Sequence, residues 1–461
     1  MSGRQQDKRM SAVFVHVSDI HFGQERGDRV YIHADVKQQL IYDAKDVVSK
    51  INGGVASGIL VTGDIAQSGK KTEYEDAAKW LDELAKSIGV EINCVQMVPG
   101  NHDFDRDKKS NSGDHVLNLI RNEGVEKFEE IMNNSTDRSA LFKRFEDYDQ
   151  FSFAYNCPLN SEGGFASEMK VNLAPGRDLR FIRFNSALLC HGGEVEATPE
   201  LIIGARQFVI PRDPGIENVV LVHHPLSWYK DEPDVRKYIY SRARVFISGH
   251  EHFPKVTVES GSDGGDIMLL AAGATVPFKS SDDYTFTYNV IEFEWDEKID
   301  GLSVTIHPRA WNSRITSFEA DARPLDGKTA TFRLACPSFR RQIDSSEEGA
   351  RGPSDSILAE EAVNPQESQP FAPVMGRDEV AMESMPSGYE IARLRFFRDL
   401  FEWERLRILV EFDALSGGGD QKINQGIERR LFDALVRQEK LKEIEAMIDS
   451  LIAERNGGDG K

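Results

Sequence analysis

Five short segments concentrate the side chains that can bind a metal ion or transfer a proton. Six of the 11 histidines lie in them, together with several aspartates and an asparagine. The segments are SDIHFG (18–23), TGDIAQSG (62–69), VPGNHDFDR (98–106), LVHHPL (221–226) and SGHEHF (248–253). Carboxylate, imidazole and amide groups suit borderline divalent cations such as Mn, Fe, Zn or Co. The segments therefore predict a metal centre.

The number of candidate ligands indicates two ions. Asp19 and His21 are two residues apart, as are His250 and His252, so each pair is expected to project to one side of an extended chain. One tetrahedral ion needs only four ligands, whereas two ions that share a bridging carboxylate lie about 3.5–4 Å apart. Glycines before three of the ligands permit sharp turns and close backbone approach. The candidate metal ligands are Asp19, His21, Asp64, Asn101, His223, His250 and His252.

Each segment follows a compact apolar run that predicts a buried strand of an α/β sheet. Ligands of open α/β sheets bind beyond the carboxyl ends of such strands, which is where the five segments lie. Helical patterns cover 36–50 and 72–87, and 265–272, 285–295 and 301–309 predict a meander of strands. The predicted buried strands are 12–18, 58–62, 92–98, 179–184, 218–222 and 244–248.

The chain is predicted to contain two folded units joined by a linker. Residues 342–386 carry 10 acidic and 2 basic side chains and five prolines, which is typical of a flexible segment. Apolar residues recur at helical spacing beyond it, in a small unit that needs its own core or that of a partner. The predicted parts are a disordered N-terminus (1–11), the main domain (12–340) with a helical insertion or cap (104–170), an acidic linker (341–386) and a helical interaction module (387–461).

Charge and composition exclude several classes of protein. The 461 residues carry a net charge of 56 − 76 = −20, which argues against a protein that coats nucleic acid through basic residues. About −8 of this charge lies in the predicted linker. No apolar run approaches the ~20 residues that span a bilayer, and the N-terminus lacks the apolar stretch of a secretory signal. Four widely spaced cysteines predict neither a disulfide framework nor a zinc knuckle, so a cytoplasmic protein is expected.

The ordered motifs resemble those of the calcineurin-like metallophosphoesterase superfamily over roughly residues 12–310. The series is Asp19-x-His21, Gly63-Asp64, Gly100-Asn101-His102-Asp103, His223 and Gly249-His250-x-His252. The resemblance implies a two-sheet α/β sandwich flanked by helices. SDIHFG, GNHDFDR and RFIRFNSALL (180–189) are similar to the branch of bacterial cyclic-nucleotide phosphodiesterases. The C-terminal module resembles, more loosely, small helical adaptor modules of bacterial effector enzymes.

The resemblance also assigns roles to the ligands. It places Asp64 between two ions, with His102 beside the scissile phosphate, where an imidazole can stabilise the transition state or protonate the leaving oxygen. One ion would be held by Asp19, His21, Asp64 and His252, and the other by Asp64, Asn101, His223 and His250. Two such ions, with manganese favoured, neutralise phosphate oxygens and activate water.

Four further residues are candidates for supporting or substrate-binding roles. Asp103 is expected to orient the loop of His102 or to cap it. Arg106 is a candidate for contact with a substrate phosphate or for a salt bridge within the loop. His191 either lines the pocket or is an ordinary loop histidine. His224 is expected to lie behind the ligands rather than among them.

The resemblance predicts hydrolysis of a phosphodiester, in a nucleotide or cyclic nucleotide. Protein phosphatases of this superfamily carry an acid and an arginine soon after the Gly-Asp motif, whereas here the residues are Ile65, Ala66, Gln67, Ser68 and Gly69. This difference argues against a protein phosphatase and leaves the orienting partner of His102 open. A metal-dependent nuclease acting on nucleic acid and a non-catalytic scaffold stay as alternatives. Residues 387–461 are expected to bind a protein partner or to self-associate.

Overall fold

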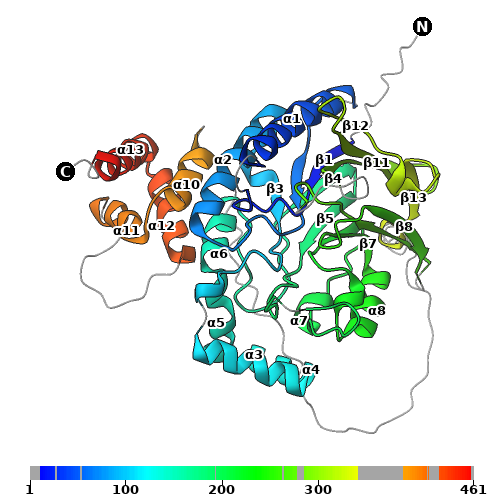
Figure 1. Cartoon of the computed structure of the whole chain (residues 1–461), viewed down its shortest axis with the longest axis horizontal. Coiled ribbons are helices and arrows are strands. Elements are labelled where there is room, and N and C mark those ends of the chain that lie inside the picture. Colours follow the sequence, from blue (N-terminus) through cyan, green and yellow to red (C-terminus); the bar gives the residue numbers. More distant parts are fainter. Residues whose placement is uncertain are drawn as a thin grey trace, which may run out of the picture.

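The computed structural model (Figure 1) describes residues 11–25, 29–51, 54–108, 110–192, 194–261, 264–277, 285–340, 388–412, 414 and 425–457. The predicted disordered N-terminus lies outside this range except for Ser11, and the predicted linker (341–386) lies wholly outside it.

Two mixed sheets form the main domain. The order of the first is β12–β11–β10–β1–β2–β3, with β13 also paired to β11, and the order of the second is β4–β5–β6–β7–β9–β8. The first contains β1 (Ala12–Val17), β2 (Gly58–Val61), β3 (Val95–Met97), β10 (Thr287–Asp296), β11 (Gly301–Asn312), β12 (Ser317–Ala320) and β13 (Thr331–Ala335). The second contains β4 (Lys170–Ala174), β5 (Arg177–Arg183), β6 (Ile216–Leu221), β7 (Ala243–Ser248), β8 (Lys255–Ser260) and β9 (Asp266–Ala271).

Apolar side chains from both sheets meet in a shared core. The ring of Phe14 on β1 lies 4.8 Å from that of Phe181 on β5 and 5.8 Å from that of Phe293 on β10. Alternate residues of β1 face the opposite way, toward a second core beneath the helices. All six residues of β1, including His16, are buried, so the strand is covered on both faces.

Helices flank the sheets, so the fold is the predicted two-sheet α/β sandwich (Figure 1). α1 (Arg29–Lys50) and α2 (Lys71–Ile88) lie beside the first sheet, and α7 (Ala205–Phe208) and α8 (Glu232–Arg242) belong to the region of the second. α2 buries an apolar stripe at helical spacing and ends at Gly89, whose φ of 74° is readily accessible only to glycine.

The stretch between β3 and β4 contains most of the predicted insertion. Its helices are α3 (Asn111–Glu123), α4 (Val125–Asn133), α5 (Ser135–Phe142) and α6 (Glu146–Ala154). α6 contacts α2, so the insertion is built onto the helical layer of the first sheet. Its function as a cap stays a prediction.

One prediction of strand pairing is wrong. The strand predicted at 265–272 does not join a meander: β9 lies in the second sheet between β7 and β8, whereas β10 and β11 pair in the first. Nothing in a strand's own pattern specifies which sheet its edges will join. Beyond the predicted linker, the first apolar residues at helical spacing lie in two helices, α10 (Tyr389–Arg398) and α11 (Glu402–Glu411).

The C-terminal module continues with α12 (Gln425–Arg437) and α13 (Leu441–Gly457). Its buried rings include Phe396, which lies 5.0 Å from Phe397 and 4.8 Å from Phe432. Within the described ranges, no helix combines the length and apolarity needed to cross a membrane.

Candidate metal centre

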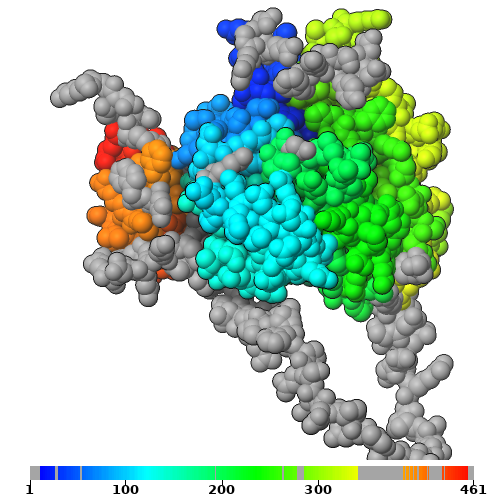
Figure 2. All heavy atoms as spheres, turned by 60° about the horizontal axis from the view of Figure 1, so that its bottom comes forward, coloured from blue at the N-terminus to red at the C-terminus, as the bar shows by residue number. Residues whose placement is uncertain are grey.

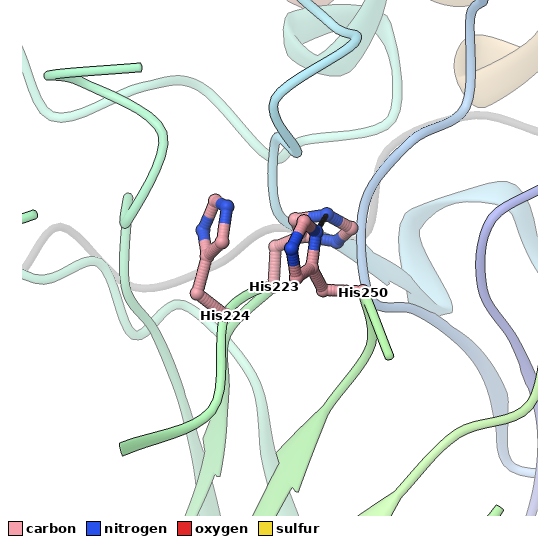
Figure 3. A group of neighbouring side chains, drawn as sticks. All are labelled: His223, His224 and His250. Carbon is pink, nitrogen blue, oxygen red and sulfur yellow. Dashed lines mark hydrogen bonds between the residues drawn. The ribbon is translucent and has the colours of Figure 1, made fainter. Parts of the chain in front are cut away.

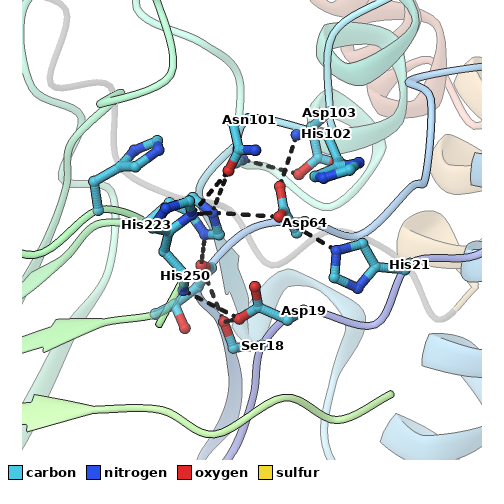
Figure 4. A network of polar contacts seen from close by, with 12 residues as sticks. Ser18, Asp19, His21, Asp64, Asn101, His102, Asp103, His223 and His250 are labelled. Carbon is cyan, nitrogen blue, oxygen red and sulfur yellow. Dashed lines mark hydrogen bonds and ion pairs between the residues drawn. The ribbon is translucent and has the colours of Figure 1, made fainter. Parts of the chain in front are cut away.

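All seven predicted ligands lie just beyond the carboxyl ends of strands, and both sheets contribute (Figure 4). The strands β1, β2 and β3 are mutually parallel, as are β6 and β7, so each set ends on one edge of its sheet. Asp19 and His21 follow β1, Asp64 follows β2, Asn101 follows β3, His223 follows β6, and His250 and His252 follow β7.

Asp64 lies at the centre of the cluster. Its Oδ2 is 3.4 Å from the Nε2 atoms of both His21 and His223. Its Oδ1 accepts a hydrogen bond of 2.8 Å from the backbone N–H of His102. The carboxylate therefore touches ligands on both sides of the cluster, which is the position that a bridging ligand requires.

The remaining ligands form two groups around Asp64. On one side, Oδ1 of Asn101 lies 3.0 Å from Nε2 of His223 and 3.0 Å from Nδ1 of His250. Those two imidazole nitrogens are 3.3 Å apart (Figure 3). On the other side, Nε2 of His252 lies 3.0 Å from Oδ1 of Asp19.

Five of the ligands occupy the left-handed region of backbone conformation. The φ angles are 54° at Asp19, 53° at His21, 52° at Asp64, 72° at His250 and 58° at His252. Non-glycine residues seldom adopt such angles, and they cluster where a site needs them. The expectation that each two-residue pair projects from an extended chain is therefore wrong: tight turns at the strand ends aim these side chains.

Glycines permit the close approach of the ligand loops, as predicted. A Cβ atom on Gly100 would lie 2.2 Å from Oδ1 of Asp64, and one on Gly249 would lie 2.3 Å from Oγ of Ser18. Real Cβ atoms do not come so close to other heavy atoms. Any larger residue would push apart the turns that carry the ligands.

Charges in the cluster favour bound cations. Burial alone would raise the pKa of Asp19 and Asp64, but the neighbouring histidines hold the pKa of both carboxyls well below the ordinary range. Burial opposes protonation of His223, yet Asp64 raises the pKa of this imidazole to about 9. Burial, and then His223, lower the pKa of His250 to about 4. Two buried carboxylates thus draw positive charge into the cluster.

The donor set fits divalent cations. Nδ1 of His21 is buried and has no hydrogen-bond partner within the described part of the chain, an arrangement that is unfavourable unless something binds there. Four overlapping groups of side chains bring their ligand atoms within 4.8 Å of one another, and three of the four contain Asp19 or Asp64. Residues of this cluster are therefore able to hold metal.

His102 is oriented by the backbone rather than by an acid. Its Nδ1 lies 2.8 Å from the carbonyl oxygen of Gln67. A carbonyl oxygen can only accept a hydrogen bond, so Nδ1 carries a proton. Nε2, the other ring nitrogen, is not part of this bond. The ring meets that of His21 edge to face at 4.9 Å, which places His102 against the ligands.

Asp103 ties together two of the ligand loops. Its buried carboxylate accepts hydrogen bonds from the backbone N–H groups of Ile65 (3.1 Å), Ala66 (2.8 Å) and Gly100 (2.9 Å). Burial, and then the charge of Asp64, raise the pKa of Asp103 to about 7, although the three N–H groups lower it. The side chain joins the loop after β2 to the loop after β3.

Tyr74 on α2 holds Asp103 through its hydroxyl group. Its hydroxyl donates to the Asp103 carbonyl oxygen at 2.9 Å and lies 3.2 Å from Oδ1 of the same residue. Burial raises the pKa of Tyr74 well above its ordinary value, so the phenol stays a donor. Sequence reasoning missed Tyr74 because its position in α2 is that of an ordinary core residue.

Other supporting groups were also missed. Ser18 Oγ donates to Oδ2 of Asp19 at 2.5 Å, and the carbonyl oxygen of Thr62 lies 2.8 Å from Nδ1 of His223. Trp228 packs edge to face on His250 at 4.3 Å. The adjacency of Ser18 to the Asp-x-His motif was the only local signal for any of them.

The remaining predicted residues lie around the cluster. His224 is fully buried, with Nδ1 2.8 Å from Oγ of Ser186 and Nε2 3.8 Å from Sγ of Cys190. Its ring centre lies 4.7 Å from that of His223 and 4.5 Å from that of His250 (Figure 3), and the three histidines form one of the four groups of possible ligands. His191 lies outside the grouped ligands, with Nε2 3.2 Å from Oε2 of Glu200.

Arg106 is exposed, and its guanidinium packs beside Gly192, where an added Cβ would lie 3.0 Å from Nη2. Neither of the predicted roles for Arg106, in substrate contact or in a salt bridge, is decided by this position.

The chain belongs to the calcineurin-like phosphoesterase family, whose model matches residues 12–254. The model of the GTPase-associated adaptor domain matches residues 388–450, in agreement with the resemblance of the C-terminal module to adaptor units. Over 98 residues the chain is 34% identical to YydB, an uncharacterized metallophosphoesterase-like protein of Bacillus subtilis. That match covers 21% of this chain and 19% of YydB, so only about a fifth of the relative is spanned.

Solved structures with similar folds are distant. A single mutant of Vps29 from Entamoeba histolytica is 10% identical, with a TM-score of 0.29, and the match covers 70% of this chain and 98% of that one. A putative 5'-nucleotidase from Staphylococcus aureus is 10% identical, with a TM-score of 0.31, over 74% of this chain and 58% of that one. Such low scores carry no information about substrate.

Proposed function

We propose that the chain is a phosphodiesterase that works with two divalent cations, with manganese favoured. The observation that supports this most strongly is the convergence of six other oxygen and nitrogen ligands around the Asp64 carboxylate. Asp19, His21 and His252 would hold one ion with Asp64, and Asn101, His223 and His250 would hold the other. When bound, such ions neutralise phosphate oxygens and lower the pKa of water.

The protein's own groups would prepare the reaction around this centre. The hydrogen bond from His102 Nδ1 to Gln67 fixes the imidazole, so Nε2 is the nitrogen available to a substrate. In its protonated form, Nε2 would stabilise charge on the phosphate or donate a proton to the leaving oxygen. Asp103 would keep the loops of Asp64 and Asn101 in register, and His224 would support the ligands from behind.

A diester is proposed rather than a phosphoprotein. The positions after Gly63-Asp64 provide no phosphate-binding arginine; instead, the backbone N–H groups of Ile65 and Ala66 bind Asp103. The proposed substrates are nucleotides or cyclic nucleotides. A nuclease is the enzymatic alternative, and a scaffold without turnover is the alternative from another class.

One assay separates these functions. The full chain is purified with Mn²⁺ and offered a chromogenic phosphodiester, the matching monoester, cyclic nucleotides and single-stranded DNA. Faster turnover of the diester or of cyclic nucleotides supports the proposal. A preference for the monoester contradicts it, and a preference for DNA supports the nuclease alternative. If metal is bound but no substrate is hydrolysed, the scaffold function holds instead.

The variant His102→Ala tests the catalytic role within the same assay. Turnover should fall by about 10²-fold or more, the usual range for loss of a general acid or base, while bound metal stays at the wild-type level. His115→Ala is a matched control, because His115 is exposed on α3. Loss of metal from His102→Ala would show that His102 is a ligand.

The C-terminal module is proposed to bind a protein partner, and its match to the GTPase-associated adaptor domain makes a GTPase the first candidate. Co-purification of the full chain with a candidate GTPase, compared with the GTPase alone, tests this. Self-association is the alternative, and light scattering of the full chain measures it.

A further inference from the structure

The C-terminal module is packed against the insertion of the main domain. In Figure 1 α10 lies beside α2 and α6, and Figure 2 shows the orange and red C-terminal part of the chain against the blue and cyan part. α10 contacts α6 more extensively than it contacts any helix of its own module. The apolar residues of α10 join the core beneath α2 and α6. The module is thus docked on the main domain through contacts between α10 and α6.

Aromatic rings form the centre of this interface. Phe397 of α10 is fully buried, and its ring meets that of Phe153 on α6 edge to face at 4.6 Å. Oriented aromatic pairs of this kind stabilise contacts beyond the area that they bury. The side chain of Gln150 donates to the carbonyl oxygen of Phe397 at 2.8 Å, and the guanidinium of Arg429 lies 5.8 Å from the ring of Phe153.

A second contact joins the module to α2 itself. The ammonium group of Lys71 lies 4.0 Å from the ring centre of Phe401, in a cation–π geometry. Lys71 is the first residue of α2, three positions before Tyr74. The module therefore contacts both α2, which carries Tyr74, and α6, which packs against Tyr74.

α6 transmits the contact to Tyr74 by ring packing. Phe151 stacks on Tyr74 with ring centres 5.0 Å apart and an interplanar angle of 23°, and Tyr148 meets the same ring edge to face at 6.1 Å. Phe151 and Phe153 belong to the same short helix, so a shift of α6 at the module interface moves the residues against Tyr74 as well.

Tyr74 in turn reaches the candidate metal centre in two steps. Its hydroxyl bonds to Asp103, and Asp103 holds the backbone of Gly100 and of Ile65. Those backbone segments lie directly beside the ligands Asn101 and Asp64. The side chains on this path, Phe397, Phe153, Phe151, Tyr74 and Asp103, are all buried.

We propose that docking of the C-terminal module on α6 sets the activity of the metal centre, with Tyr74 as the positioning residue that carries the effect through Asp103. The inference rests on the proposed phosphodiesterase function. The docked module holds α6 against Tyr74 and keeps the Asn101–His102 turn in place. When α10 leaves α6, the turn loosens and turnover falls.

The test compares full-length, Mn²⁺-loaded variants in the phosphodiester assay. Phe153→Ala and Gln150→Ala weaken the interface from the α6 side, and Phe397→Ala weakens it from the module side. Each is expected to lower kcat by about threefold or more, while KM stays within about twofold of the wild-type value. The change in kcat is in the range of measured couplings between linked elements. Phe153→Leu should restore most of kcat. Ile391→Ala, an exposed residue on the same helix α10, is the matched control and should match wild type.

Hydrogen exchange gives a readout that does not need turnover. Weakening the interface should raise deuterium uptake in residues 99–106 but not in β6. Tyr74→Phe should produce the same change, and combining it with Phe397→Ala should add little, because both act on one chain of contacts.

The inference is overturned if the interface variants release α10, seen as raised uptake in α10, while kcat and uptake in 99–106 stay at wild-type levels. Fully additive effects of Tyr74→Phe and Phe397→Ala would also overturn it. If the wild-type chain hydrolyses no phosphodiester, the proposed function fails, while the exchange experiment still decides whether the module and the turn are coupled.

Discussion

Replacing Asp103 tests whether one buried carboxylate holds the ligand loops together. In Asp103→Ala, three buried backbone N–H groups lose their acceptor. Each buried donor left unpaired costs about 1–3 kcal/mol. Because such costs overlap within one network and water can enter the space, the expected loss is about 3–5 kcal/mol. For a domain of this size, that corresponds to a fall in Tm of about 5–10 °C.

Asp103→Asn should be less harmful, for a reason that the geometry supplies. Oδ2 accepts from the backbone N–H groups of Gly100 and Ile65, whereas Oδ1 accepts from one backbone N–H, that of Ala66, and lies 3.2 Å from the Tyr74 hydroxyl. An asparagine that places its carbonyl oxygen at the Oδ2 position keeps two of the three bonds and sets its NH₂ group against one N–H. The expected loss is about 1–2 kcal/mol.

Scanning calorimetry of the full chain, with chelator and with Mn²⁺, measures both variants. Asp107→Ala is the matched control, since Asp107 belongs to the same loop but its side chain is 85% exposed and pairs with Lys70 at the surface. Tm should follow the order wild type, Asp103→Asn, Asp103→Ala. A Tm for Asp103→Ala within about 1 °C of wild type, or an asparagine variant less stable than the alanine variant, would refute the reasoning.

Three further predictions concern the glycine, the metal and one buried acid. Gly100→Ala should abolish tight Mn²⁺ binding, since its Cβ would lie 2.2 Å from Oδ1 of Asp64; calorimetric titration that shows wild-type affinity would contradict this. Mn²⁺ at about 100 times its Kd should stabilise the wild-type chain by about 2.7 kcal/mol, and Asp64→Asn should lose most of that gain in thermal melts with and without chelator. Burial raises the pKa of Asp149 to about 6, so its ionisation destabilises the fold increasingly as pH rises from about 4 to about 6. Asp149→Asn keeps the acceptor for the Leu159 N–H and should raise Tm at pH 8 more than at pH 5; an equal shift at both would show that Asp149 titrates normally.

The convergence of the candidate ligands was predictable because their signal is local. Strand, glycine and ligand follow one another within a few residues, and parallel strands end at one edge of a sheet, so Asp64 and Asn101 had to meet. The local pattern did not reveal how the side chains are aimed. Asp19 and His21 reach the cluster through left-handed turns, because β1 ends before them and the chain bends there.

Partners that lie far apart along the chain were decided only by the tertiary structure. His102 finds its orienting acceptor in the carbonyl of Gln67, and no side-chain pattern can indicate a backbone group 35 residues away. Tyr74 meets Asp103 because α2 packs under the loop after β3. α10 is amphipathic by sequence, but an apolar face shows only that something covers it. The packing of Phe397 on Phe153 identifies α6 as that cover, since the shape of a complementary surface exists only once both segments have folded.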